Sequence, residues 1–274
     1  MEKGKIRRRK IYDNHVEMRR IEDFFITDAE ENYESHIADY NGFESSIDGR
    51  YICSDLMKET FPLYNESQSS RYRYNVAVHN SAAVLTEELF NRKIKDPNIK
   101  KCIILTGVPG AGKTFFAQSL GKTLEEDTMI YEGSIINSSI FEKLENAQKE
   151  GIEVSIIVVN PTIELSVRNV VVRQFEIGRD ASPALIADMF YKIPVSLTEI
   201  HKKYPNIDLA IYNKFDNYSV EDVYGFEYLS LLDHGRYEEV LSNVEMCRDA
   251  ILSELKENYN IGEGNKSLWK VGNI

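Results

Sequence analysis

The sequence contains few cysteines, and their placement excludes two classes of cross-linked protein. Only three cysteines occur among 274 residues. They form no CxxC pair and no zinc-type spacing with the five histidines, so neither a disulfide framework nor a structural zinc site is expected. The N-terminus is basic but lacks the apolar segment of a secretory signal. These features are typical of a reducing compartment, and we expect a cytoplasmic protein.

The chain also lacks long apolar runs and net positive charge. No stretch approaches the roughly 20 apolar residues of a membrane helix, so no membrane association is expected. The net charge is −11 and the pI is about 5.1, which disfavours a nucleic-acid partner because phosphate backbones repel such a chain. Residues 5–10, KIRRRK, are a local exception. We interpret them as a solvated tail, with contact to nucleic acid or acidic lipid as the alternative.

Apolar runs alternate with helical patterns through the middle of the chain. Runs at 101–107, 128–133, 154–160 and 208–214 are typical of strands buried on both faces, and 50–54 is a shorter candidate. Helices are expected at 76–94, 115–124, 138–150, 164–178 and 182–202. This alternation predicts an α/β fold with a mostly parallel sheet between two helical layers. We expect a helical N-terminal appendage at 1–49, a core at 50–218 and a helical extension at 219–274.

The strongest motif lies between the strand at 101–107 and the helix that follows. It reads GVPGAGKT and matches the GxxxxGK[ST] pattern of a P-loop NTPase. Its glycines let backbone N–H groups converge on phosphate oxygens. Lys113 can neutralise the β- and γ-phosphates of ATP, and Thr114 can ligate Mg²⁺. The expected nucleotide-binding residues are Gly107, Val108, Pro109, Gly110, Ala111, Gly112, Lys113, Thr114 and Phe115.

Phosphoryl transfer to an alcohol needs a carboxylate near the hydroxyl and cations near the phosphate. Asp55 follows the candidate strand at 50–54 and Glu132 follows the apolar residues TMIY at 128–131, and such groups lie at the carboxyl ends of strands in parallel sheets. A helix N-cap is the alternative for Asp55, and an exposed strand-end charge is the alternative for Glu132. Arg168, Arg173 and Arg179 could belong to a lid over the phosphates. Their alternative is a solvated helix face.

In this order the residues resemble the zeta toxin family of bacterial P-loop kinases. Residues 52–62, ICSDLMKETFP, resemble the family segment that carries its catalytic aspartate. Glu132-Gly133-Ser134 resembles a later family strand end, and Ser166 precedes Arg173 by the family interval of seven. The Asp-bearing strand follows the phosphate loop in the family but precedes it here. The resemblance therefore implies that the core is circularly permuted, with a changed strand order.

The resemblance implies transfer of the ATP γ-phosphate to the sugar 3′-hydroxyl of UDP-N-acetylglucosamine. Asp55 would be the base and would also contact the substrate, while Lys113, Arg173 and Arg179 would stabilise the transferred group. Glu132 and Ser134 would contact the sugar nucleotide. The family also implies a toxin role and inhibition by a small helical antitoxin. Residues 1–49 could act as this inhibitor in cis.

Two other functions stay open from the residues alone. One is a kinase of another metabolite, such as a dinucleotide or a phosphorylated sugar. The other is a P-loop ATPase or switch that acts through protein partners. The strand at 154–160 ends in Asn160 rather than in a magnesium-binding aspartate, which disfavours the switch.

Overall fold

A computed structural model describes residues 6–216 and 219–259, and in it six strands form one sheet. The order across the sheet is β1-β3-β2-β4-β5-β6; the first five are parallel, and β6 pairs antiparallel with β5. The predicted α/β fold with permuted strand order is confirmed. The strands are β1 (Tyr51–Cys53), β2 (Lys101–Thr106), β3 (Thr128–Glu132), β4 (Glu153–Pro161), β5 (Asp208–Lys214) and β6 (Val220–Tyr224).

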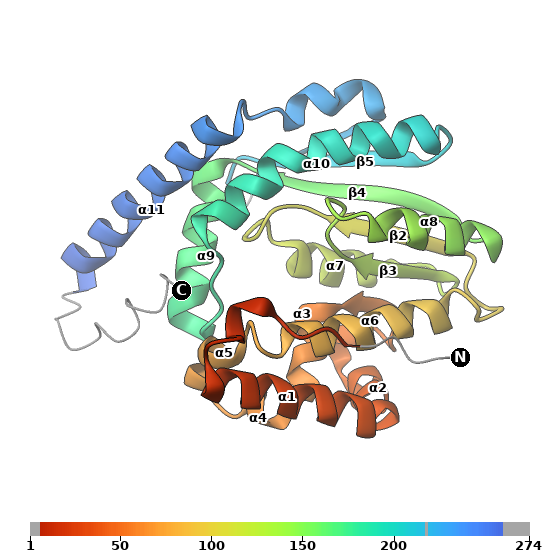
Figure 1. Cartoon of the computed structure of the whole chain (residues 1–274). Coiled ribbons are helices and arrows are strands. Elements are labelled where there is room, and N and C mark those ends of the chain that lie inside the picture. The colour runs from red at the N-terminus through yellow and green to blue at the C-terminus, as the bar shows by residue number, and fades with distance from the viewer. Residues whose placement is uncertain (1–5, 217–218, 260–274) are drawn as a thin grey trace.

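Helices cover both faces of the sheet and give three layers (Figure 1). Ile52 and Tyr131 face α6, where Phe90 packs against Tyr131 at 5.0 Å between ring centroids. On the opposite face, Phe116 of α7 packs edge-on against Tyr212. The helices are α1 (Val16–Glu31), α2 (Tyr33–Gly42), α3 (Ser54–Met57), α4 (Pro62–Asn65), α5 (Gln68–Tyr74), α6 (His79–Lys93), α7 (Lys113–Gly121), α8 (Ser139–Lys149), α9 (Ile163–Ile177), α10 (Pro183–Lys203) and α11 (Tyr237–Tyr259).

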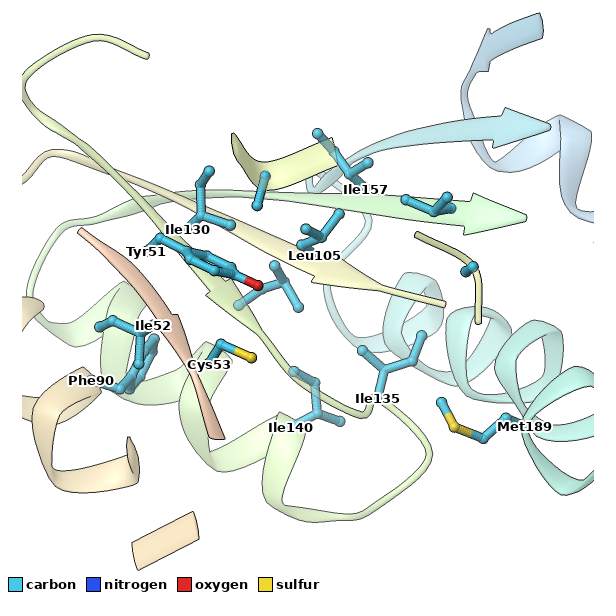
Figure 2. Packing of buried hydrophobic residues seen from close by; sticks show 14 of the residues in the cluster. Tyr51, Ile52, Cys53, Phe90, Leu105, Ile130, Ile135, Ile140, Ile157 and Met189 are labelled. Carbon is cyan, nitrogen blue, oxygen red and sulfur yellow. The ribbon is translucent and has the colours of Figure 1, made fainter. Parts of the chain in front are cut away.

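The central strands form because their residues are buried on both faces. Ile104 and Leu105 of β2 are 1% and 0% exposed, and Ile130 and Ile156 of the neighbouring strands are also buried. Burial on both faces explains why apolar runs, rather than an alternating pattern, marked these strands. Figure 2 shows this core, with Tyr51 and Ile52 on opposite faces of β1.

The N-terminal helices are part of the same core. Phe25 of α1 is fully buried and meets Phe61 edge-on, at 5.6 Å between centroids. The Tyr40 hydroxyl of α2 donates to the Tyr51 carbonyl and accepts from the Cys53 N–H, each at 2.8 Å. A side chain thereby satisfies the free edge of β1, which would otherwise be open to pairing with another chain. The division of the chain at residue 49 stays a prediction.

The C-terminal part differs from the expected helical extension in one respect. Val220–Tyr224 forms edge strand β6, which pairs Ile211 with Val223. Its residues are mostly exposed, so the strand has no apolar run or clear alternation. Helix α11 follows and packs against α9 and α10 at the edge of the molecule (Figure 1). Residues 260–274 of the predicted extension lie outside the described residues. None of the described helices combines the length and apolar character that a membrane span requires.

Candidate active site

The phosphate loop joins β2 to α7 in a conformation that needs its glycines. Gly107, Gly110 and Gly112 have positive φ angles of 148°, 76° and 85°. A Cβ on Gly110 would lie 2.2 Å from the Ser166 carbonyl oxygen, and one on Gly107 would lie 2.4 Å from the Val159 carbonyl oxygen. Both contacts are too short for any side chain. The loop is therefore packed closely against β4 and α9, as an anion-binding turn requires.

Helix α9 holds the loop through two hydrogen bonds. The Ser166 hydroxyl donates to the Pro109 carbonyl at 2.8 Å, and the Asn169 amide donates to the Gly110 carbonyl at 2.8 Å. Helix α9 begins after Thr162, whose hydroxyl accepts from the Leu165 N–H. The resemblance marked Ser166 only by its interval to Arg173. Its position behind the loop was not predicted.

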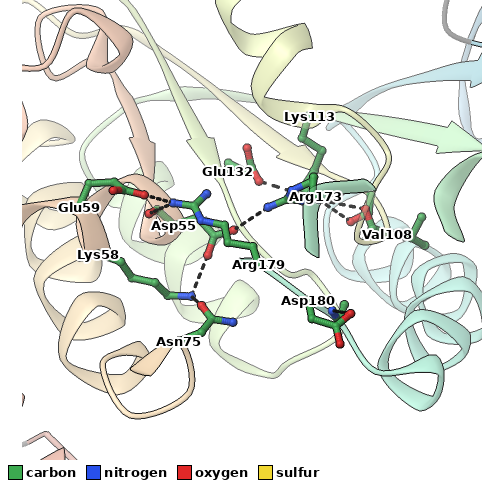
Figure 3. A network of polar contacts seen from close by, with 12 residues as sticks. Asp55, Lys58, Glu59, Asn75, Val108, Lys113, Glu132, Arg173, Arg179 and Asp180 are labelled. Carbon is green, nitrogen blue, oxygen red and sulfur yellow. Dashed lines mark hydrogen bonds and ion pairs between the residues drawn. The ribbon is translucent and has the colours of Figure 1, made fainter. Parts of the chain in front are cut away.

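Lys113 begins α7 and lies between the loop and β3 (Figure 3). Its ammonium donates to the Gly107 and Val108 carbonyls at 3.0 and 3.1 Å and lies 3.8 Å from a Glu132 carboxylate oxygen. The Glu132 side chain is only 12% exposed, so the alternative of an exposed strand-end charge is wrong. Lys113 is thus held over the loop beside a partly buried carboxylate.

Tyr51 is a site residue that the sequence analysis missed. Its phenol donates to the Glu132 carboxylate and lies close to the Thr114 hydroxyl. The side chain is fully buried, and burial, more than the nearby Cys53 and Glu132, raises the pKa of Tyr51 far above its usual value. Tyr51 therefore stays a neutral donor. Tyr51 faces α7 because of the register of β1 in the sheet, so no local sequence pattern identified it as a site residue.

Asp55 lies in the first turn of α3, just beyond β1. One carboxylate oxygen accepts from the Lys58 ammonium at 2.8 Å, and the other lies 3.9 Å from the Arg173 guanidinium (Figure 3). The attraction of Lys58, with that of Arg179 and Arg173, outweighs the partial loss of hydration and holds the pKa of Asp55 well below its usual range. The N-cap position of α3 belongs to Cys53, so the N-cap alternative for Asp55 is wrong. Asp55 is a charged, oriented and 40% exposed carboxylate.

Strand pairing explains how Asp55 and the loop reach the same edge of the sheet. Cys53 of β1 and Leu105 of β2 are both in register with Glu132 of β3. Asp55 and Gly107 each follow two residues later, beyond the carboxyl ends of these parallel strands. With adjacent strands about 4.8 Å apart, β1 and β2 are separated by roughly 10 Å. Carboxylate and loop therefore flank Glu132 on either side.

The three candidate arginines have different partners. Arg173, on α9, faces Asp55. Arg179 lies in the turn between α9 and α10, where its guanidinium donates to the Asp55 carbonyl at 3.0 Å and pairs with Glu59. Its side chain is only 16% exposed. Arg168 pairs instead with Glu254 at 3.1 Å, as its helix-face alternative expected. The structure thus brings Arg173 and Arg179 to Asp55 and turns Arg168 away.

The tight turn that carries Arg179 is built by capping residues. Gly178 ends α9 in the left-handed region, with a φ of 77°. Ser182 caps α10, accepting from the Leu185 N–H at 3.2 Å, and Pro183 occupies the first turn. A Cβ on Gly178 would lie 2.4 Å from the Gln68 carbonyl oxygen. The turn is therefore fixed against α5, which limits how Arg179 can move.

The remaining predicted residues lie around the loop. Thr114 and Phe115 follow Lys113 in the first turn of α7, and the Phe115 ring is 74% exposed. Ser134 follows β3 and is exposed; its hydroxyl accepts from the Ile136 N–H at 3.4 Å. Within the described part of the chain, no three His, Cys, Asp or Glu residues group as a metal site. Thr114 fits the magnesium role, because Mg²⁺ binds mostly to phosphate oxygens and water and needs few protein ligands.

Comparison with known proteins does not show the family of this chain. No protein-family model and no curated protein matches it. A solved structure described as belonging to the PezAT chromosomal toxin–antitoxin system of Streptococcus pneumoniae is similar, at 15% identity and a TM-score of 0.45. The likeness covers 76% of this chain and 75% of that chain. A likeness of this size leaves the function to be argued from the residues of the chain itself.

Proposed function

We propose that this protein is a small-molecule kinase that uses ATP and Mg²⁺. The observation that carries the proposal is the proximity of a depressed-pKa carboxylate, Asp55, and a partly exposed arginine, Arg173, at the edge of the sheet that holds the phosphate loop. A carboxylate for the acceptor hydroxyl and cations for the phosphates are what phosphoryl transfer to an alcohol requires. A simple nucleotide-binding module has no need of the carboxylate.

In the proposed reaction, an acceptor hydroxyl oxygen forms a bond to the γ-phosphorus as the bond to ADP breaks. Lys113 and Arg173 stabilise the negative charge on the transferred group. The hydroxyl proton passes to the Asp55 oxygen that Lys58 does not occupy. A carboxylate of low pKa is a weak base, but it suits a loose transition state in which the hydroxyl loses its proton late. Mg²⁺, ligated by Thr114, would neutralise phosphate charge.

Arg179 has another role in this proposal than the one implied by the family resemblance. Its guanidinium is bound by Glu59 and by the Asp55 main chain. We infer that it fixes the position of α3, and so of Asp55, rather than binding the phosphates. Contacts of this kind hold a reacting group in a productive geometry.

For the acceptor, we propose the sugar 3′-hydroxyl of UDP-N-acetylglucosamine. Glu132 ends β3 and Ser134 follows it, between the loop strand and the strand that leads to Asp55, and both would contact the sugar nucleotide. A dinucleotide or a phosphorylated sugar is the competing acceptor. The switch alternative gains nothing here, because the Asn160 amide donates to Asn213 and to the Leu231 carbonyl, a structural role.

A toxin role and an antitoxin partner belong to the same proposal. Inhibition of the kinase in cis by residues 1–49 is less favoured than inhibition by a separate antitoxin. Helix α2 of this segment packs against α3 and along the free edge of β1, and α1 packs against α6. Their deletion would remove core packing, so lost activity would not demonstrate or exclude inhibition. We therefore propose a separate antitoxin.

Transfer of label from γ-labelled ATP tests the reaction. The protein is incubated with Mg²⁺ and, separately, with UDP-N-acetylglucosamine, other sugar nucleotides and dinucleotides. Label on the 3′-hydroxyl of the sugar in UDP-N-acetylglucosamine, absent with Lys113→Ala, is the expected result. Label on a dinucleotide alone would show that the acceptor is a dinucleotide. Label only on inorganic phosphate would overturn the kinase proposal in favour of an ATPase.

A further inference from the structure

Lys214 ends strand β5 and brings a second ammonium to the phosphate loop. A Cβ on Gly112 would lie 3.0 Å from the Lys214 Nζ atom. Tyr212, two residues earlier, packs against Phe116 of α7 at 4.6 Å between ring centroids. Because alternate strand residues share a face, Lys214 stands on the α7 face of the sheet. Its ammonium therefore lies next to the glycine that precedes α7.

This ammonium has no anionic partner among the residues that the structure describes. Lys113 has a carboxylate oxygen at 3.8 Å and Lys58 has one at 2.8 Å, whereas the Lys214 ammonium forms neither an ion pair nor a hydrogen bond with any described residue. It lies beside Gly112, in a loop whose three glycines have positive φ and whose backbone amides gather toward an anion. A cation beside such amides is repelled unless an anion lies between them.

The strand order indicates which part of a nucleotide Lys214 would meet. Asp55 and Arg173 lie on the β1 side of loop strand β2, and Lys214 lies on the opposite side, two strands away across β4. In the proposed reaction, the transferred phosphoryl group points toward Asp55. The other end of the phosphate chain, which continues into the nucleoside, then lies on the Lys214 side.

We propose that Lys214 is a second phosphate-binding residue of this protein, which pairs with the phosphates next to the nucleoside. The inference rests on the proposed nucleotide site, and it assigns different cations to different parts of the nucleotide. Lys113 and Arg173 serve the group that moves, whereas Lys214 holds the part of the nucleotide that stays. Lys214 is thus a binding residue whose charge contributes equally before and during transfer.

Calorimetric titration of the full chain with Mg²⁺-ADP tests this role. Neutralising Lys214 with Lys214→Gln is expected to weaken ADP binding roughly 10-fold to 100-fold, because a hydrogen bond to a charged group contributes about 1.5–3 kcal/mol. Lys214→Arg should restore most of the affinity. Lys122→Gln, which removes the same charge from the far end of α7, is the matched control and should bind as wild type does.

Thermal unfolding separates binding from a merely structural role. Without nucleotide, Lys214→Gln should be as stable as wild type or slightly more so, since an unpaired cation has been removed. With saturating ADP, its stabilisation should be smaller than that of wild type. A structural lysine would instead lower the unfolding temperature in both conditions.

Two results would overturn the role of Lys214. One is ADP binding by Lys214→Gln within twofold of wild type, and the other is a loss of stability in the free variant that explains the weaker binding. These outcomes are independent of the reaction. If wild type binds ADP through Lys214 but transfers phosphate to no acceptor, the kinase proposal fails and this inference stands. If wild type binds no nucleotide, both fail.

Discussion

The Asp55 carboxylate lies 3.9 Å from the guanidinium of Arg173, although one residue follows β1 and the other lies on α9. This pair joins the segment after β1 to the helix that braces the phosphate loop. In the proposed reaction, the cation would meet the transferred phosphoryl group while the carboxylate meets the acceptor hydroxyl. The relationship motivates separate tests of the two residues.

Arg173→Gln is expected to slow phosphate transfer and to leave ADP binding nearly unchanged. An electrostatic contact made mainly in the transition state affects the rate by about 10²–10³-fold. The measurement is kcat alongside the Kd for ADP. Arg168→Gln, on the same helix but paired with Glu254, is the matched control and should keep full activity. Equal losses in ADP binding and rate for Arg173→Gln would contradict the assignment.

Gly110→Ala is expected to abolish nucleotide binding. The new Cβ would clash with the Ser166 carbonyl at 2.2 Å and would also occupy an unfavourable backbone conformation. Gly151 separates the two effects, because its φ of 74° is nearly the same but nothing lies within 4 Å of its Cβ position. Gly151→Ala should cost about 1–2 kcal/mol of stability and should bind ADP normally. If both variants bind ADP, the close packing of the loop on α9 is not needed.

The low pKa of Asp55 predicts how Lys58 shapes the pH dependence. Lys58 is the largest cause of the lowered pKa, so Lys58→Met should raise it. Because its folded pKa is lowered, the Asp55 carboxylate adds stability above its unfolded pKa of about 3.9, and this stability is lost as pH falls toward the folded pKa. With the raised pKa of the variant, Asp55 is protonated, and so cannot accept the hydroxyl proton, at a higher pH than in wild type. The acid limb of kcat/KM should therefore move to higher pH in the variant. The control is Lys143→Met, another buried lysine, which pairs with Glu87.

An unmoved acid limb in Lys58→Met would show that Asp55 is not the group whose ionisation controls the rate. A lower rate at every pH, with the same limb, would be the signature of a structural role for Lys58. Urea titrations of both variants at pH 7 show whether folding is intact before the rates are compared.

Tyr40→Phe is expected to lower the free energy of unfolding by roughly 1–3 kcal/mol, the cost of leaving buried hydrogen-bonding groups unsatisfied. The variant loses the hydroxyl that serves the Tyr51 carbonyl and the Cys53 N–H. Urea denaturation measures the change, and Tyr191→Phe is the control because Tyr191 is 43% exposed. Equal stability of the two variants would mean that the edge of β1 needs no side-chain partner.

The elements whose signals are local could be predicted from the sequence. Runs such as 101–107 are apolar throughout because β2 is buried on both faces, and the glycine spacing of the loop reflects backbone conformations that other residues avoid. Strand β6, which is mostly exposed, was not predicted, and no helix was predicted at 62–74, where α4 and α5 lie. Those helices span four and seven residues, too short for a clear period.

Site residues whose roles depend on distant partners were beyond the sequence. Tyr51 gains its role from the register of β1 with β3, and Lys58 from an Asn75 amide oxygen 2.8 Å away. Lys214 reaches the loop only because β5 lies two strands from β2. The position of Asp55 was predicted from its place after a short candidate strand and from the family resemblance. Its catalytic role stays a prediction.

The most direct test of the account replaces Asp55 with asparagine and measures transfer and binding in the same preparation. Asp55→Asn keeps the size of the side chain but removes the acceptor for the hydroxyl proton. We expect transfer of label from ATP to fall by about 10²–10⁴-fold, with ADP binding retained and with Asp39→Asn, on the exposed side of α2, fully active. Transfer by Asp55→Asn at near the wild-type rate would contradict the central claim that this carboxylate acts on the acceptor.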